Sequence, residues 1–312
     1  MMLQEDTLVT VAVLSYNSEK TIKETLDSII RQTYQKIELI ISDDHSLDNT
    51  ISICEEWLKT NKSRFQRTRL ITVDDNTGVT GNCNRCVAES HGEWLRLIAA
   101  DDILLPNAID SYMVFARNNP RADWIISKHH TYNNTFEESN RLKPSPEEYS
   151  LKWRTILSLP AEEQLKHMYN QNFVIGPTSM TKTAILRTIG FDEKYPSLED
   201  YPINIKLLKN GIKCYFCDEY TMGYRRGMTN VCASNSKIFN LKYKYSRLLV
   251  QRDLCYEHYT WGRKRFEEAN YKQCQIYQQL GMNNAKNPIY RYSFALINKI
   301  MRILFGVKRE KY

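Results

Sequence analysis

Glycine is scarce in this sequence, and its distribution excludes two common nucleotide-binding motifs. Only 11 of the 312 residues are glycine, and the first is Gly78. Dinucleotide-binding folds and P-loop NTPases need a glycine-rich turn after their first strand, so that the backbone can approach a phosphate. Here the first predicted strand is followed by SYNSE at 15–19. A nucleotide bound by this chain therefore needs its phosphates neutralised in another way, and a divalent cation held by carboxylates is the obvious route.

Long apolar runs are also missing. Met1–Asp6 is acidic and no apolar core follows it, so we predict no signal peptide. The longest apolar stretch near either end, Ser293–Val307, is interrupted by Lys299 and Arg302 and is too short and too charged to cross a bilayer. These features predict a cytoplasmic location by default.

The eight cysteines favour a reducing compartment, in which thiols stay free. Two pairs, Cys83/Cys86 and Cys214/Cys217, have the C-x-x-C spacing of zinc ligands. The second pair lies in a predicted strand, and neither pair has the turn glycines of a zinc knuckle. Buried free thiols are therefore the favoured interpretation, with a zinc site as the alternative.

The first 130 residues alternate short apolar runs with helical patterns, which indicates an α/β fold with a mainly parallel sheet covered on both faces. Ser18 is the expected N-cap of the first helix. The predicted strands are 8–14, 37–42, 69–73, 94–99 and 124–127, and the predicted helices are 18–31, 49–59 and 81–90.

The pattern changes twice further along. Segment 131–172 carries Pro144, Pro146 and many polar residues, so we expect an insertion or lid there rather than a sheet element. Helices at 182–189 and 200–209 and a strand at 212–217 follow, and the chain from about 236 reads as helical.

Most of the net charge of +7 lies at the C-terminal end, which points to an anionic partner for this tail. On a helical wheel, a broad apolar face stands opposite a narrow basic one, as in helices that lie in a membrane interface. The alternative is a helix packed on the protein with a solvated basic rim. The apolar face holds Phe294, Leu296, Ile297, Ile300, Met301, Ile303 and Leu304, and the basic face holds Arg291, Asn298, Lys299 and Arg302.

Acidic pairs follow three of the first four predicted strands. In sheets of this kind ligands bind at the carboxyl ends of the strands. Neighbouring carboxylates repel one another, so their accumulation there indicates a shared cation. The residues after the strands are Ser15-Tyr16-Asn17, Asp43-Asp44, Asp74-Asp75 and Asp101-Asp102.

Four segments in this order resemble the motifs of family 2 glycosyltransferases. They are VAVLSYN (11–17), QTYQKIELIISDDHSLDNT (32–50), GVTGNCNRCVAESHGEWLRLIAADDILLP (78–106) and SLEDYPINIKLLKNG (197–211). The resemblance covers residues 8–230 and is closest to the bacterial branch that builds O-antigen, capsule and other surface polysaccharides. It implies a GT-A fold, a Rossmann-like and mainly parallel sheet flanked by helices, in a catalytic domain at 1–235. Segment 131–172 would then be an acceptor-side insertion, and 236–312 a helical basic extension.

The resemblance implies a metal site at Asp101 and Asp102. These residues match the end of the family's D-x-D motif, which holds Mg²⁺ or Mn²⁺ on the donor diphosphate. Ala99 stands where many relatives have the first acid, so Asp102 is the preferred ligand and Asp101 the second. The alternative is an acidic helix N-cap before a helix at 104–116.

The resemblance also implies a nucleotide site. Asp44 matches the acid that accepts from the uracil N–H, and Tyr16, between Ser15 and Asn17, matches the ring that packs beside the base. The alternatives are an ordinary turn at Asp43-Asp44 and a core aromatic at Tyr16.

Three further positions extend this predicted nucleotide site. Asn82 and Arg85 are expected to line the nucleotide or phosphate region, although Arg85 could instead pair with a neighbouring acid. Arg225 is expected to touch the diphosphate, since guanidinium suits phosphate oxygens. Gly227 stands where relatives have a histidine ligand, so that ligand role is lost.

Asp200 matches the catalytic base of inverting members, with Glu199 beside it. Such a base takes the proton of the acceptor hydroxyl as its oxygen attacks the anomeric carbon, opposite the departing diphosphate. The alternative is an acidic pair that begins a helix.

We therefore expect an inverting glycosyltransferase that moves a sugar from a nucleoside-diphosphate donor, with UDP-sugar as the favoured donor. The expected acceptor is a lipid-linked oligosaccharide in surface-polysaccharide synthesis, met at the inner face of the cytoplasmic membrane through the C-terminal tail. The alternative is a non-catalytic nucleotide- or glycan-binding subunit of the same fold. Nucleic acid is not an expected partner, because acid-lined strand ends repel its phosphates.

Overall fold

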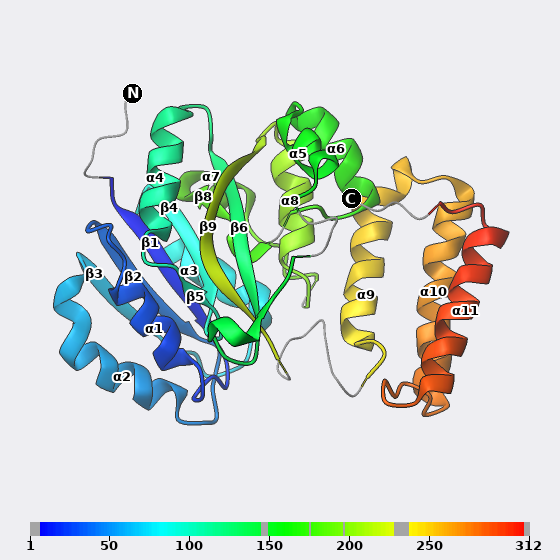
Figure 1. The fold of residues 1–312 in the computed structure, drawn as a ribbon, viewed down its shortest axis with the longest axis horizontal. Coiled ribbons are helices and arrows are strands. Elements are labelled where there is room, and N and C mark those ends of the chain that lie inside the picture. The colour runs from blue at the N-terminus through cyan, green and yellow to red at the C-terminus, as the bar shows by residue number, and fades with distance from the viewer. Residues whose placement is uncertain (1–6, 145–148, 175, 196, 228–236, 309–312) are drawn as a thin grey trace.

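The computed structural model describes residues 7–144, 149–174, 176–195, 197–227 and 237–308. Figure 1 shows an α/β body with a central sheet and, at one end, a group of three C-terminal helices drawn in yellow to red.

In the part of the chain that the structure describes, nine strands form one sheet in the order β3-β2-β1-β4-β8-β6-β9-β5, with β7 paired to β6. Their bounds are β1 Val9–Ser15, β2 Ile37–Asp43, β3 Arg67–Ile71, β4 Trp94–Ala99, β5 Ile103–Leu104, β6 Trp124–Asn133, β7 Arg141–Leu142, β8 Met180–Lys182 and β9 Cys214–Arg226.

The sheet is parallel at its N-terminal side and mixed beyond it. β3, β2, β1 and β4 pair in parallel, and so do β6 and β9. β8 runs antiparallel between β4 and β6, and β5 and β7 are also antiparallel to their partners. Ser15 is in register with Asp43, and Leu14 with Ala99. The predicted strand ends therefore do meet at one edge of the sheet.

The described residues form eleven α-helices. They are α1 Ile22–Ile30, α2 Thr50–Asn61, α3 Gly78–Glu89, α4 Ala108–Asn118, α5 Leu151–Ser158, α6 Ala161–Asn170, α7 Thr183–Ile189, α8 Asp200–Lys209, α9 Leu241–Val250, α10 Trp261–Gln279 and α11 Pro288–Leu304.

Two helix starts differ from the sequence prediction. Ser18 does not cap α1: its carbonyl accepts from the Thr21 and Ile22 N–H groups in a turn that precedes the helix. The helix expected at 104–116 begins later, at Ala108, because Ile103–Leu104 pairs with β9 as a short strand. The capping interpretation of Asp101-Asp102 is therefore wrong, and Asn107 occupies the N-cap position.

The core lies in two layers, one on each face of the sheet. Val11 and Val13 of β1 join a cluster with residues of α1, α2 and α4, whereas Ala12 faces a second cluster with residues of α5, α6 and α8. This alternation follows from the period of two along a strand. Because both faces are covered, β1 and β2 are buried almost throughout, which is why they read as continuous apolar runs.

Segment 131–172 is more regular than the sequence suggests. β6 continues to Asn133, and Arg141–Leu142 adds a strand beside it. Trp153 of α5 and Met168 of α6 are buried in the second core layer. The expectation of a segment without sheet elements is therefore wrong in part, while its role on the acceptor side stays a prediction.

The cysteines of the described residues are buried free thiols, as the sequence favours. Cys83 and Cys86 lie on α3, and Cys214 and Cys217 on β9. Burial raises the pKa of the Cys86 thiol to about 12 and that of Cys217 to about 11, which opposes formation of the thiolate that a metal requires.

The predicted helical C-terminal extension is confirmed. α9, α10 and α11 lie side by side at one end of the molecule (Figure 1). Phe239, Cys274 and Tyr277 form a small third core, against which Phe294 packs. Among the described helices, none is both long enough and apolar enough to cross a bilayer.

Candidate active-site cleft

A cavity of about 560 Å³ opens at the carboxyl edge of β1 and β4, within the size range of small-molecule sites. Five of the residues predicted from the sequence line it: Ser15, Tyr16, Asn82, Glu199 and Asp200. Other lining residues that matter below are Asn76, Gly78, Ala99, Gly176, Asn204 and Lys242. The cleft thus joins the ends of the N-terminal strands to the start of α8 and to α9.

The carboxylate of Asp200 is held in place from two sides. It accepts a hydrogen bond from the amide of Asn172 at 3.1 Å and one from the Tyr201 N–H at 2.7 Å. The amide of Asn204 donates in turn to Asn172 at 3.2 Å. A β-carbon at Gly176 would lie 2.9 Å from the Asp200 β-carbon and 3.1 Å from its Oδ2. Position 176 therefore needs glycine so that the chain can pass this close to the carboxylate.

The Glu199–Asp200 pair has raised pKa values. Burial raises the pKa of Glu199 to about 7, and the neighbouring Asp200 contributes to that rise. Burial also raises the pKa of Asp200, against hydrogen bonds from Tyr201 and Asn172 that lower it. Glu199 precedes α8 but its side chain makes no capping hydrogen bond. Both carboxyl groups therefore bind a proton at higher pH than an ordinary carboxylate does.

Asp44 lies behind the cleft wall instead of in it. Its carboxylate accepts from the Gly78 N–H at 2.7 Å, the Thr77 hydroxyl at 2.7 Å and the Arg85 guanidinium at 2.6 Å. Burial by itself raises the pKa of Asp44, but the bonds from Arg85 and Thr77 outweigh it and hold the pKa below its usual range. Gly78 has a φ of 80°, which suits glycine at the turn that carries its N–H to Asp44. Arg85 thus pairs with a neighbouring acid, which the sequence left open.

Asp43 and Asn17 shape the loops that border the cleft. Asp43 accepts from the Ser15 hydroxyl at 2.8 Å and from the Ser46 N–H at 2.7 Å, as in an ordinary turn. The Asn17 side chain accepts from the Leu47 N–H at 2.8 Å. These bonds tie the loop after β1 to the loop after β2.

Tyr16 and Asn82 offer free groups to a ligand. Tyr16 is 49% exposed, so it is not a core aromatic. Asn82 is buried, and its amide donates to the Ser42 carbonyl at 3.0 Å. Its Oδ1 has no hydrogen-bond partner among the described residues. A buried acceptor without a partner is costly, and this one belongs to a residue of the cleft wall.

Asp101 and Asp102 do not line the cleft. Asp102 is 1% exposed and accepts from the Arg225 N–H at 2.8 Å, while the Asp101 carbonyl accepts from the Arg225 side chain at 2.8 Å. Arg225 is also paired with Glu24. Burial raises the pKa of both acids, and Asp101 raises that of Asp102 further. The N–H and the charge of Arg225 oppose this effect on Asp102, and so does Arg96, which is fully buried on β4.

The donor set at Asp101 and Asp102 suits a cation that has other ligands. Among the described residues no group of three or more His, Cys, Asp or Glu side chains is placed to hold a metal. Burial is the main cause of the raised pKa of Asp102, and the neighbouring Asp101 adds to it, so a divalent cation would relieve the repulsion between the two carboxylates. Phosphate oxygens and water would have to complete its coordination. The third acidic pair, Asp74-Asp75, is exposed and does not join the cleft.

Four residues of this region were not predicted from the sequence: Asn172, Asn204, Arg96 and Lys242. Asn172 and Asn204 orient Asp200 from different elements, and no spacing rule connects them. Arg96 was visible as a charge inside a predicted buried strand, a signal that could have singled it out. Lys242 reaches the cleft from α9, so only the packing of the C-terminal region places it there.

Sequence comparison gives a family match. The family model described as glycosyl transferase family 2 matches residues 10–190. An uncharacterised glycosyltransferase of Methanocaldococcus jannaschii is 28% identical over 220 residues, which are 70% of this chain and 70% of that protein. The Escherichia coli protein WfaP, named UDP-Glc:α-D-GlcNAc-diphosphoundecaprenol β-1,3-glucosyltransferase, is 25% identical over 232 residues, which cover 74% of this chain and 82% of that protein.

Structure comparison identifies the fold. The crystal structure of residues 1–349 of Staphylococcus aureus TarS aligns with a TM-score of 0.56 at 20% identity, covering 78% of this chain. This chain spans 64% of that structure, which is less than two thirds of its length. The complex of the same TarS segment with UDP-GlcNAc aligns with a TM-score of 0.58 at 19% identity, over 85% of this chain and 72% of that one. The predicted GT-A fold is thereby confirmed.

Proposed function

Because this chain belongs to glycosyl transferase family 2, we propose that it transfers a sugar from a UDP-sugar to a glycan hydroxyl, with inversion at the anomeric carbon. The observation that carries the proposal is one cleft that holds both Asp200 and the free groups of Tyr16 and Asn82. The relative WfaP is named for UDP-glucose, and TarS has been crystallised with UDP-GlcNAc, which favours a UDP-linked donor here.

The nucleotide binds at the ends of β1 and β2 in this proposal. Tyr16 offers an exposed ring on which a base can stack. The partnerless Oδ1 of Asn82 accepts from an N–H of the base. Asp44 acts indirectly: through the Gly78 N–H and Arg85 it fixes the turn that begins α3, where Asn76 and Gly78 form the cleft wall. Its predicted contact with the base would need this set of bonds to open.

Asp200 is the proposed base. Asn172 donates to its Oδ2, and the Tyr201 N–H donates to its Oδ1. The carboxylate would take the proton from the acceptor hydroxyl while that oxygen attacks the anomeric carbon and the nucleoside diphosphate leaves. Glu199 is the other acid of the cleft, and burial together with the neighbouring Asp200 raises its own pKa to about 7.

Asp101 and Asp102 would hold Mg²⁺ or Mn²⁺, the type of ion that the family typically uses. Bound there, the ion would supply charge stabilisation to the departing diphosphate. The positive charge of the buried Arg96 partly compensates the negative charge of Asp102 in the protein interior. Arg225 braces the pair by bonding to both residues.

The proposed acceptor is a lipid-linked glycan of bacterial surface-polysaccharide synthesis, met at the cytoplasmic face of a membrane. The name of WfaP specifies a diphosphoundecaprenol acceptor for that relative. In this chain α11 turns Phe294, Asn298 and Arg302 inward: Phe294 packs on the third core, Asn298 bonds to Asn270 and Arg302 lies 4.6 Å from the Phe266 ring centre. The expected apolar face is therefore wrong for Phe294. The exposed side is mainly apolar, also carries Arg291 and Lys299, and suits the membrane interface. The exposed residues there are Ile289, Tyr292, Leu296, Ile297, Ile300, Ile303 and Leu304.

A donor screen tests the proposal. Thermal unfolding is followed with UDP-, dTDP- and GDP-sugars, each with and without Mn²⁺, because a ligand that binds the folded state raises Tm. We expect a UDP-sugar to give the largest rise, and a larger rise with Mn²⁺. Equal shifts for all three nucleotides would contradict the UDP assignment.

The same donor then separates the enzyme from its alternative. A catalytic protein releases UDP from the bound UDP-sugar, slowly to water and faster with a lipid-linked acceptor. A non-catalytic binding subunit shows the thermal shift but releases no UDP. Donor binding without any UDP release on a panel of acceptors would favour that second function.

A further inference from the structure

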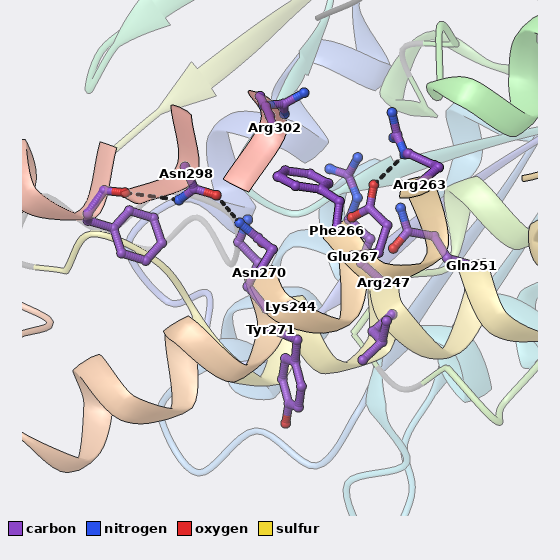
Figure 2. Close-up of a pocket in the computed structure, with 12 residues that line it drawn as sticks. Lys244, Arg247, Gln251, Arg263, Phe266, Glu267, Asn270, Tyr271, Asn298 and Arg302 are labelled. Carbon is purple, nitrogen blue, oxygen red and sulfur yellow. Dashed lines mark hydrogen bonds and ion pairs between the residues drawn. The ribbon is translucent and has the colours of Figure 1, made fainter. Parts of the chain in front are cut away.

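A second pocket lies between α9, α10 and α11, in the C-terminal helices. Its volume is about 250 Å³, and it shares no described lining residue with the cleft. Figure 2 shows its side chains converging from the three helices. We call it the α9–α11 pocket. Its charged residues are Lys244, Arg247, Arg263, Arg302 and Glu267.

The α9–α11 pocket holds more positive than negative charge. Four cations surround one carboxylate, Glu267, and that carboxylate is paired with Arg263 at 2.7 Å. The side chains of Lys244 and Arg247 make no hydrogen bond or ion pair with any described residue. Burial lowers the pKa of the Lys244 ammonium, and the nearby Arg247 and Arg302 lower it further. Glu267 is the one carboxylate among the described lining residues that offsets these four cations, so a bound anion would balance the remaining charge.

Gln251 is a second, independent sign of a binding site. It is 2% exposed and lines the pocket, yet its Nε2 has no hydrogen-bond partner among the described residues. Buried amide donors are normally satisfied. Gln251 also begins a π-helical turn, Gln251–Cys255, that ends α9, and such turns occur often at functional sites. An anion in the pocket would accept from this amide.

We propose that the α9–α11 pocket binds a phosphate or diphosphate group. Guanidinium groups bind phosphate oxygens through paired, charge-assisted hydrogen bonds, and an ammonium adds a compact positive charge. The pocket provides both, at Arg247 and Lys244, together with the free amide of Gln251. A soluble phosphate compound and the phosphate of a membrane lipid carry the same chemistry. Arg302 belongs to α11, whose opposite side is apolar and exposed, so either source can approach.

The first experiment titrates the full-length protein with pyrophosphate in the presence of EDTA, which suppresses any cation-dependent binding of diphosphate in the cleft. Thermal unfolding and calorimetry report the binding. The variants are Lys244→Gln and Arg247→Gln. The control is Lys272→Gln, which removes the same charge from an exposed position on α10 outside the pocket.

We expect saturable stabilisation of the wild-type protein and of the control. Each pocket variant should bind pyrophosphate about tenfold more weakly or worse, the equivalent of one lost charge-assisted contact. Lys244→Gln removes no hydrogen bond or ion pair to a described residue, so it keeps the test decisive if Arg247→Gln fails to fold. Absence of saturable binding by the wild type, or equal affinity in Lys244→Gln and Lys272→Gln, would overturn the proposal.

A second experiment identifies the source of the phosphate. Vesicles with phosphatidic acid, a phosphate monoester, are compared with phosphatidylglycerol vesicles of matched surface charge. If Lys244→Gln weakens binding only to the phosphatidic acid vesicles, a membrane lipid is the ligand. If it weakens pyrophosphate binding but changes neither vesicle, the ligand is a soluble or substrate-borne phosphate. Both outcomes are measured by binding and do not depend on turnover in the cleft. A failure of this proposal can therefore be distinguished from a failure of the proposed function.

Discussion

The cleft and the α9–α11 pocket carry opposite charge, and they are built in different ways. The acids that line the cleft, Glu199 and Asp200, lie at the start of α8. Asp43, Asp44 and Asp101 lie at the same edge of the sheet, because parallel strands bring their carboxyl ends together there. In the α9–α11 pocket, the cations come from three helices whose side chains line the same cavity. Burial is the main cause that raises the pKa of Asp102 and lowers that of Lys244, and like-charged neighbours add to each shift.

The largest expected effect is at Asp200. Asp200→Asn keeps the shape of the side chain but removes the proton acceptor, so kcat for sugar transfer should fall by about 10²–10⁴-fold. Thermal shifts with the donor should stay near the wild-type values. Asp75→Asn, at an exposed strand end outside the cleft, is the control and should leave kcat unchanged. Normal turnover by Asp200→Asn would remove the catalytic assignment of the cleft.

Asp44 tests whether buried acids at the strand ends support the structure of the cleft. Asp44→Ala leaves Arg85 and the Gly78 N–H without their acceptor. Urea unfolding should show a loss of about 1.5–3 kcal/mol in the free energy of unfolding, accompanied by weaker donor binding. Asp74→Ala, from the exposed pair after β3, should change neither. If the two variants unfold at the same urea concentration, the hydrogen bonds of Asp44 do not contribute to the free energy of unfolding.

The exposed side of α11 tests whether the C-terminal helices bind a membrane. Ile300 and Ile303 are exposed, Ile303 to 71%. Replacing both with serine should lower binding to anionic vesicles at least tenfold, because each isoleucine side chain contributes about 1.5–3 kcal/mol when it is buried. UDP release in the absence of membranes should not change. The exposed Ile276 of α10 provides the control, Ile276→Ser, and an equal loss in that variant would show that the effect is not specific to α11.

Glu199 gives a pH dependence of stability with a defined sign. Its pKa rises from a usual 4.5 to about 7 on folding, so between these values the folded protein binds more protons than the unfolded chain. The free energy of unfolding contributed by Glu199 is therefore greatest below pH 4.5 and is lost as the pH rises through 7. Denaturation followed from pH 5 to 8 should show a weaker decline in Glu199→Gln than in the wild type. A parallel course in both proteins would contradict the raised pKa.

The smallest expected effect concerns Asn172, whose hydrogen bond lowers the pKa of Asp200. In Asn172→Ala that pKa rises, so the acidic limb of the kcat/KM profile should move to higher pH. The maximal rate should fall less than in Asp200→Asn. An unchanged midpoint would show that Asn172 has only a packing role. Asn119→Ala, which removes an amide at the C-terminal end of α4, is the control.

Local sequence patterns predicted the regular elements that alternate along the chain. The strand Trp94–Ala99 and the helix Asp200–Lys209 have the predicted bounds. The patterns were less informative where distant segments pair. Ile103–Leu104 reads as part of a helix until β9 provides a strand partner for it. β8 is three residues long and joins β4 to β6, and no periodicity can show so short a strand.

The site residues divide along the same line. Ser15, Tyr16, Asn82, Glu199 and Asp200 were predicted from motifs, and they do share one cleft. The roles of Asp44 and Arg85 in supporting the turn at Gly78 depend on which donors surround them, which a motif does not state.

By itself the sequence determined that acids follow successive strands, that glycine-rich phosphate loops are missing and that the last helix is amphipathic, because these are properties of neighbouring residues. Only the tertiary structure decided that Asn172 and Gly176 enclose Asp200 and that four cations from three helices surround one carboxylate. The physical reason is range. Hydrogen bonds and burial act between atoms in contact, and the residues that make those contacts are far apart in the chain.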